Sequence, residues 1–219
     1  MKGDVEELYD YDVLRSLGAA TMFVVHPSVP TFVLGGSQSI DVLDPDRRAH
    51  LALRRRRGGG GLVLLQPGDA WIDWWIPAED VRWSSDVHAM SERVGEWWRQ
   101  VLRERVDGDV RVHHGNLVGP AQLRVACFAG RGPGEVFVDD LKAVGVTQWR
   151  VREGSFISTV LPAHSSAALL DVLAEVPLGL EQALEHYDLA SLGVDADDLG
   201  VALARVSDPI EVRQLFLVA

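Results

Sequence analysis

Apolar positions recur every three or four residues between Ser85 and Val106, the longest helical pattern in the chain. Such spacing places the apolar side chains on one face of a helix, which packs against a core. Ser84 or Ser85 is the expected cap of this helix, and Asp107-Gly108-Asp109 ends it. The apolar positions of the pattern are Val87, Met90, Val94, Trp97, Trp98, Val101 and Leu102.

Shorter helical patterns lie towards both ends of the chain. Residues from Glu6 to Leu17 carry apolar side chains at helical spacing, and the pattern stops at Gly18. Asp44-Pro45-Asp46 predicts the start of a helical turn, because proline is tolerated at the first helical position. The last quarter of the chain predicts four helices, at Ser165–Leu173, Leu178–His186, Asp195–Ala204 and Pro209–Val218.

Runs of β-branched and aromatic residues, bounded by glycine and proline, predict strands between these helices. Strands with helices before, between and after them indicate an α/β (α+β) fold with a mixed sheet. We find no internal repeat and no domain linker, so we expect one domain over residues 1–219 with a helical C-terminal part from about residue 165. The expected strands are Thr21–Val25, Thr31–Leu34, Leu51–Leu53, Leu62–Leu65, Ala70–Ile76, Leu123–Phe128, Glu135–Val138, Val144–Val151 and Ser155–Leu161.

The composition is that of a globular protein, with 47% hydrophobic and 24% charged residues among 219. No apolar stretch approaches the roughly 20 residues that a membrane span needs. The acidic start of the chain lacks the apolar segment of a secretory signal. Cys127 is the only cysteine, which excludes an internal disulfide and favours a reducing compartment, so we expect a cytoplasmic protein.

The formal net charge of −11 makes nucleic acid and anionic membranes poor partners. Positive charge is concentrated in one segment, where Arg47, Arg48 and Arg54–Arg57 lie within eleven positions. A basic spot on an acidic protein favours a localised anionic ligand over a long polyanion. The arginines alone are equally consistent with a solvated charge cluster.

Four consecutive glycines, Gly58–Gly61, follow the arginines between two expected strands. Ordered glycines lose much backbone entropy, and close approach of a ligand to backbone N–H groups is one reason to keep them. Arginines beside such a loop supply planar contacts to phosphate or carboxylate. A flexible hairpin with exposed charges is the alternative. No Lys-Ser/Thr follows, and no helix follows the glycines, so neither a Walker loop nor a dinucleotide fingerprint is present.

The segment from Leu51 to Val63 resembles the Arg-Arg-x-x-Gly-Gly-Gly-x-Val signature of the lipoate/octanoate-protein ligase and transferase family. In the best register Arg55 and Arg56 fall on the arginines, and Gly59–Gly61 fall on the glycines. Upstream, the segment Phe32-Val33-Leu34-Gly35-Gly36-Ser37-Gln38 resembles that family's strand ending in Gly-x-x-Gln. Downstream, residues 138–150 resemble its Gly-Lys-Lys-Ile-x-Gly-Ser-Ala-Gln-x-Arg block. Three blocks in the right order are more specific than any one of them.

The resemblance implies a biotin/lipoate protein ligase-like catalytic fold. It also implies transfer of an octanoyl or lipoyl group to a lysine of a lipoyl-type carrier domain. Lys142, one of two lysines in the chain, matches the family lysine that reaches the acyl carbonyl, where an ammonium stabilises developing negative charge. The implied substrate-binding residues are Gln38, Arg55, Arg56, Gly59, Gly60, Gly61, Gly145 and Gln148.

Cys127 stands in an apolar segment, which by itself is typical of a buried small hydrophobe. The cysteine-dependent octanoyl- and lipoyl-transferases that the chain resembles carry a Cys-Phe pair upstream of their lysine block. This resemblance implies that Cys127 takes the acyl group as a thioester and passes it to the target lysine. Lys142 is then the expected cation beside the thiol.

The sequence departs from the family pattern at several positions. Leu64-Leu65-Gln66 stands where the family commonly has Phe-His-Asp or Tyr-His, and Ile157-Ser158-Thr159 replaces its His-Gly-Ser. These departures leave open a non-catalytic relative that binds a lipoyl-type ligand or partner, and ATP-dependent ligation as a third alternative. The implied partner is a lipoyl-domain or acyl-carrier protein, and the lipoyl or octanoyl group is the implied substrate. The sequence assigns no cofactor, and the use of ATP stays open.

The remaining candidate residues carry weaker signals. His113-His114 and the other histidines lack metal-ligand spacing, so we expect no metal site. Six tryptophans between Trp71 and Trp98 are expected to pack in the core, with the lining of an acyl tunnel as the alternative.

Overall fold

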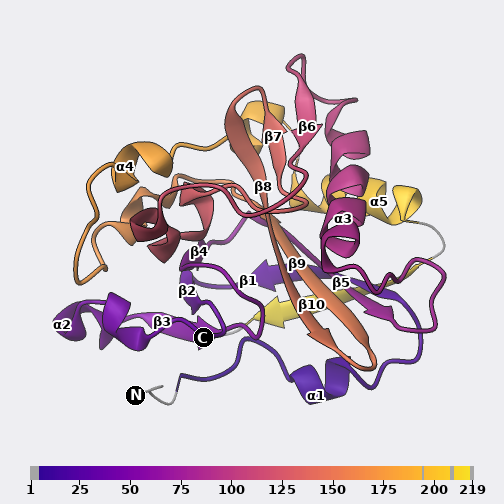
Figure 1. Cartoon of the computed structure of the whole chain (residues 1–219), viewed down its shortest axis with the longest axis horizontal. Coiled ribbons are helices and arrows are strands. Elements are labelled where there is room, and N and C mark those ends of the chain that lie inside the picture. Colours follow the sequence, from indigo (N-terminus) through magenta and orange to yellow (C-terminus); the bar gives the residue numbers. More distant parts are fainter. Residues whose placement is uncertain (1–4, 194, 208–209, 218–219) are drawn as a thin grey trace.

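The structure of the protein is a computed structural model that describes residues 5–193, 195–207 and 210–217 (Figure 1). It has a mixed α/β architecture, as the sequence predicts, with one large and one small sheet. The seven-stranded sheet has the order β10 (Glu211–Leu217), β1 (Thr21–Pro27), β5 (Ala70–Pro77), β9 (Gly154–Leu161), β8 (Leu141–Val151), β7 (Val136–Val138) and β6 (Val110–Val112). The three-stranded sheet has the order β3 (Ala52–Arg55), β2 (Thr31–Leu34) and β4 (Val63–Leu65).

Strand pairing is mostly antiparallel, which short connections along the chain favour. Among the described strands, the parallel pairs are β1 with β10 and β2 with β3. Strand β10 forms one edge of the large sheet, and Thr21 to Pro27 of β1 pair in register with Glu211 to Leu217. The last strand, β10, therefore pairs with β1, the first strand of the chain.

The helices are short apart from α3 and α5, which pack against each other and against the large sheet (Figure 1). Helix α3 begins after Asp86, whose side chain accepts hydrogen bonds from the backbone N–H groups of His88 and Ala89. The cap lies one residue after the position predicted from the sequence. The α-helices are α1 (Tyr11–Leu14), α2 (Pro45–Arg48), α3 (Val87–Leu102), α4 (Leu180–Ala183) and α5 (Ala196–Val206). The 3-10 helices are η1 (Ile40–Val42), η2 (Ala121–Val125), η3 (Cys127–Ala129), η4 (Ser166–Leu169) and η5 (Leu189–Leu192).

Alternate residues of β5 enter two hydrophobic cores on the opposite faces of the large sheet. Trp71 and Trp75 pack with the small sheet and the N-terminal segment. Ile72 and Trp74 pack on the other face, with apolar residues of α3 and α5. Every residue of β5 is buried, which explains why its sequence is apolar at every position except Asp73.

Two predicted elements are wrong in type, at residues 123–128 and at the last predicted helix, and a third, the first predicted helix, is much shorter than predicted. The segment Glu6–Leu17 is helical only at Tyr11–Leu14, because Glu7 forms a β-bridge with Arg55 of β3. Residues 123–128 form two 3-10 turns rather than a strand, because the backbone around Ala126 pairs only with Leu62.

The last predicted helix is strand β10, whose alternating residues Leu215 and Leu217 pack on the core. Pro209 and Val218, the predicted helix ends, lie outside the described residues. The C-terminal part from about residue 165 is thus only partly helical: α5 matches its prediction, whereas the other segments contain single turns and a strand. The sequence also gave no signal for β6. Over the described part of the chain, no helix has the length and apolar character needed to cross a membrane.

Candidate active site

The glycine loop, strand β8 and the turn at Cys127 enclose a cavity of about 540 Å³. Segments that are far apart in sequence meet there, since the loop follows β3, the turn precedes β7 and α3 closes one side. The residues that line it include Gln38, Gly59, Gly60, Gly61, Ser91, Arg124, Cys127, Glu135, Thr147 and Gln148. Of the tryptophans in the described chain, none lines this cavity, which favours the packing role for them.

The buried side chain of Arg56 holds the glycine loop in place through hydrogen bonds to backbone carbonyl groups. Its guanidinium is buried and donates hydrogen bonds to the carbonyl oxygens of Val33 at 3.1 Å, Gly59 at 2.8 Å and Gly61 at 2.7 Å. Burial lowers the pKa of Arg56, and its electrostatic interaction with Cys127 acts against that shift. Arg56 is therefore a buried cation next to the thiol, and it forms no ion pair with a carboxylate of the described residues.

The glycines are needed where the loop approaches its neighbours most closely. Gly60 has a φ of +89°, a backbone conformation that favours glycine. A Cβ at Gly60 would lie 3.0 Å from Arg56 Nη2 and 3.9 Å from Cys127 Sγ. A Cβ at Gly35 would collide with the Gly60 carbonyl. Hence the glycine run is an ordered wall of the cavity.

The backbone N–H groups of Gly59, Gly60 and Gly61 make no hydrogen bond to any other described residue. Consecutive N–H groups of this kind form a concavity that binds an anion or a developing oxyanion. Thr147 closes the loop from β8, since its hydroxyl donates to the Gly59 carbonyl at 2.9 Å.

Arg55 and Gln38 support the loop rather than facing a ligand together. Arg55 donates to the carbonyl oxygens of Gly35 at 2.9 Å and Gln38 at 2.7 Å, and it does not line the cavity. The Gln38 amide accepts from Gly35 N–H and donates to the Val125 carbonyl at 2.9 Å, while its side chain borders the cavity.

The two outer arginines of the cluster are paired with acidic residues. Arg54 lies 3.2 Å from Glu6, and Arg57 forms a two-pronged contact of 2.8 Å with Glu7. The basic segment is thus largely neutralised by the N-terminal strand segment. Arg124 is the exposed cation at the cavity rim, and none of the described carboxylates forms an ion pair with it.

Cys127 begins the 3-10 helix η3 with its thiol at the cavity wall. Its backbone N–H donates to the Leu62 carbonyl at 2.9 Å, which ties the turn to the strand that follows the glycine loop. The side chain is half-buried, so the sulfur is accessible from the cavity. Cys127 thus packs against the hydrophobic core on one side and borders the cavity on the other.

Lys142 is buried on β8, with 3% of its side chain exposed. Its ammonium donates to the Glu135 carboxylate at 2.8 Å and to the Cys127 carbonyl at 2.9 Å, and it lies over the Phe128 ring. Lys142 does not line the 540 Å³ cavity; it lines a smaller hollow of about 300 Å³ that lies next to the Phe128–Arg131 segment. Lys142 therefore contacts the turn of Cys127 from outside the cavity.

Glu135 connects Lys142 to the cavity, and the sequence did not single it out. Its carboxylate also accepts from the Gly132 N–H at 2.6 Å. Burial raises the pKa of Glu135, and the Lys142 charge acts against that rise. The only sign of this role in the sequence is the position of Glu135 directly before the apolar residues Val136–Val138.

Gly145 and Gln148 have separate roles on β8. A Cβ at Gly145 would lie 3.1 Å from the Phe128 ring, so this glycine makes room for the ring that covers Lys142. Gln148 lines the cavity and accepts from the Ser91 hydroxyl of α3 at 3.3 Å. Its amide nitrogen is buried and has no hydrogen-bond partner among the described residues, which leaves a donor for a ligand.

Comparison with known proteins gives matches in structure only. No family model and no curated protein matches the sequence. A putative lipoate protein ligase from T. acidophilum with bound lipoic acid superposes with a TM-score of 0.70 at 18% identity, over 100% of this chain and 90% of that one. Lipoate-protein ligase A bound with ATP gives a TM-score of 0.69 at 19% identity, with the same two coverages of 100% and 90%. The chain has the lipoate-protein ligase fold.

A third similar structure of this fold is described with a partner. It is a bi-partite lipoate protein ligase and its E2 lipoyl domain from Thermoplasma acidophilum, with a TM-score of 0.67 at 18% identity, over 96% of this chain and 80% of that one. The fold prediction made from the three sequence blocks is thus confirmed, although identity to these structures is low.

Proposed function

We propose that this protein transfers an octanoyl or lipoyl group to a lysine of a lipoyl-type carrier domain, through a thioester on Cys127. The observation that carries the proposal is the position of the Cys127 thiol in the wall of a cavity that is also lined by the unpaired backbone of Gly59–Gly61. The buried Arg56 cation lies on the other side of Gly60 from the thiol. Lipoic acid bound to a similar structure supports an acyl chain of this class. A lipoyl domain described with another similar structure supports the acceptor.

In the first step the Cys127 thiolate attacks the carbonyl carbon of an acyl thioester on the donor carrier. A carbon–sulfur bond to Cys127 forms, and the bond to the donor sulfur breaks, so the donor leaves as a thiolate. The N–H groups of Gly59–Gly61 stabilise the negative charge on the carbonyl oxygen. Arg56 stabilises the Cys127 thiolate before the attack and after the acyl group has left.

In the second step the neutral amine of the acceptor lysine attacks the Cys127 thioester. The new carbon–nitrogen bond replaces the carbon–sulfur bond, Cys127 returns to the thiolate, and the amine proton passes to water in the open cavity. Lys142 holds the Glu135 carboxylate and the Cys127 carbonyl in place. In this geometry Lys142 positions the turn, and the contact to the acyl carbonyl expected from the family resemblance passes to the glycine loop.

Incubation with an octanoylated carrier protein tests the thioester. Intact-mass measurement should show a gain of about 126 Da, one octanoyl group, that Cys127→Ala abolishes. Because Cys127 is the only cysteine, a hydroxylamine-labile adduct on the wild type identifies the site directly. Thermal stabilisation by lipoate or octanoate without any adduct or transfer would instead identify a non-catalytic binding protein.

ATP-dependent ligation is the second candidate, because one of the similar structures holds ATP. In that case the acyl group reaches the cavity as a mixed anhydride formed from a free acid, and Cys127 is dispensable. Release of pyrophosphate that depends on both ATP and lipoate, undiminished in Cys127→Ala, is the result that favours ligation over the thioester route.

A further inference from the structure

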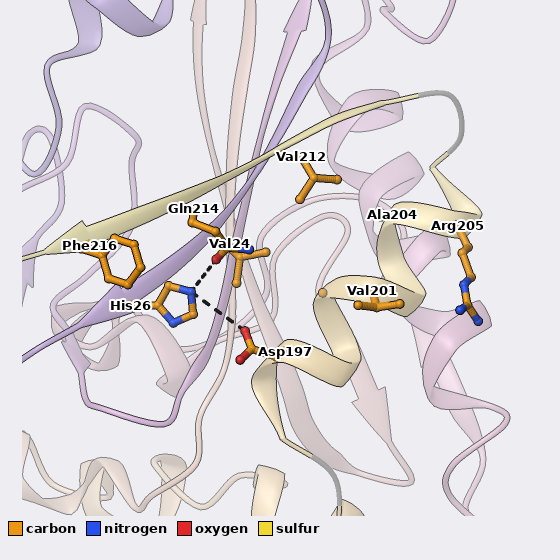
Figure 2. Close-up of a pocket in the computed structure, with 10 residues that line it drawn as sticks. Val24, His26, Asp197, Val201, Ala204, Arg205, Val212, Gln214 and Phe216 are labelled. Atoms are coloured by element: carbon orange, nitrogen blue, oxygen red, sulfur yellow. Dashed lines mark hydrogen bonds and ion pairs between the residues drawn. The ribbon is translucent and has the colours of Figure 1, made fainter.

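A groove of about 1040 Å³ lies between α5 and the edge strands β10 and β1 (Figure 2). Three strands, β1, β5 and β9, separate β10 from the strand β8 that lines the reaction cavity. The groove therefore has no part in the proposed acyl transfer. Its walls are apolar in the middle and charged at the ends, where Asp197 and Arg205 lie (Figure 2).

Helix α5 presents a charged and apolar stripe to this groove. Asp197, Val201 and Arg205 are four residues apart, so they lie on one face at intervals of about 6 Å along the helix axis. Val201 is 55% exposed and the Asp197 side chain is 72% exposed. None of the described acidic residues forms an ion pair with Arg205.

The order acid, valine, base along the stripe is self-complementary. A two-fold axis through Val201 places a second α5 antiparallel to the first, with valine against valine. The same operation places the acid of each stripe against the base of the other. Ala204 borders the groove beside Val201, and a small side chain there allows two helices to approach closely. Gly200 is buried against Val24 of β1.

Strand β10 supplies the rest of the apolar surface. Val212 is 44% exposed and Phe216 is 72% exposed, and both border the groove (Figure 2). The Phe216 ring stacks on His26 at 5.0 Å, and His26 in turn lies 2.5 Å from the Gln214 amide oxygen and 3.9 Å from Asp197. A parallel strand pair such as β1–β10 is usually covered on both faces. Here α5 covers Val24 of β1, which is 3% exposed, and leaves Val212 and Phe216 of β10 exposed.

We propose that two copies of this chain associate through the groove, with α5 of each copy seated against α5 and β10 of the other. Val201 lies on the two-fold axis, Asp197 faces Arg205 of the partner subunit, and Phe216 and Val212 are covered by the partner. A second copy is the occupant that fits the charges, because an antiparallel copy of the stripe places its basic residue beside the acidic residue of the first stripe. Both reaction cavities stay open in such a dimer, since they border β8 rather than β10.

Sedimentation velocity of the full chain tests the interface. We expect the wild type to sediment at twice the 24.0 kDa chain mass, and Val201→Glu to sediment as a monomer. Leu178→Glu is the matched control, because Leu178 is 97% exposed outside the groove and its charge should leave the dimer intact. Circular dichroism checks that each variant is folded.

Charge reversal separates this geometry from any other use of the groove. Asp197→Arg and Arg205→Asp should each weaken dimerisation at least about tenfold, because each places like charges together. The double variant Asp197→Arg/Arg205→Asp should restore the wild-type dissociation constant. A wild type that stays monomeric at about 100 µM overturns the proposal. A double variant no tighter than the single ones overturns it equally, as does a monomer that binds a lipoyl domain through this groove.

Discussion

The Lys142 ammonium lies 2.8 Å from the Glu135 carboxylate, and both side chains are almost completely buried. The attraction between the two charges offsets the large free-energy penalty of removing both from water, so neither charge is stable in this position without the other. The Cys127 carbonyl accepts a second hydrogen bond from the same ammonium. The turn that carries the thiol is therefore fixed by a buried ion pair.

Removal of one member of this pair should destabilise the protein strongly. Glu135→Gln leaves the Lys142 cation without its counter-charge, and we expect a loss of about 3–5 kcal/mol in the free energy of unfolding. Urea denaturation measures the loss. The double variant Glu135→Gln/Lys142→Met removes both charges and should recover most of it; equal losses in the single and double variants would contradict the role of the pair.

The glycine loop offers a comparison of neighbouring positions. Gly60→Ala should cost about 1–2 kcal/mol and slow acylation of Cys127, because Gly60 has φ of +89° and its Cβ would press on Arg56. Gly59→Ala is the control, since a Cβ there meets no atom within 4 Å. Urea denaturation and the rate of adduct formation should distinguish the two variants. Similar behaviour of both would remove the steric argument.

Arg56 should control the reactivity of the thiol. Arg56→Met removes the buried cation and four hydrogen bonds to three carbonyl oxygens, so alkylation of Cys127 by iodoacetamide at neutral pH should slow about tenfold. Arg56→Lys keeps the charge and should recover part of the rate. A purely structural role predicts the same rate in both variants, so folded Met and Lys variants that react alike would refute the electrostatic role.

Stability should fall as the pH rises from about 4 to about 7 through Asp73. Burial raises the pKa of Asp73 to about 7, although it accepts hydrogen bonds from Tyr9, Ser158 and Thr159. The folded state therefore holds a proton that the unfolded chain has released, and the difference weakens folding until the folded carboxyl ionises.

Asp73→Asn should remove this part of the pH dependence. The wild type and the variant should differ in slope between pH 4 and 7, with a change on the order of 4 kcal/mol as the upper bound. Asp41→Asn, at an aspartate whose side chain is 73% exposed, is the control. Parallel curves of unfolding free energy against pH for wild type and Asp73→Asn would show that Asp73 does not titrate in this range.

The elements with one unambiguous hydrophobic pattern were predictable from the amino-acid sequence. Thr31–Leu34 is a strand with the predicted bounds, and α3 lies within its predicted segment, because a helical stripe of many residues admits one interpretation. Cys127 and Gly59–Gly61 were singled out from motifs alone, and they meet at one cavity. The segment of β10 was misread, because seven residues are too few to separate period 2 from period 3.6.

Which side chains of the site contact each other depends on how the strands and turns pack in three dimensions. A register shift between β7 and β8, at Val136 and Phe137, accompanies the position of Lys142 beside Glu135 and outside the cavity. No sequence pattern predicts the distance between Lys142 and Glu135, because it depends on the register in which β7 and β8 pair. The burial of Arg56 could not be predicted either. Four successive arginines look alike in sequence, and packing gives each of them a different environment.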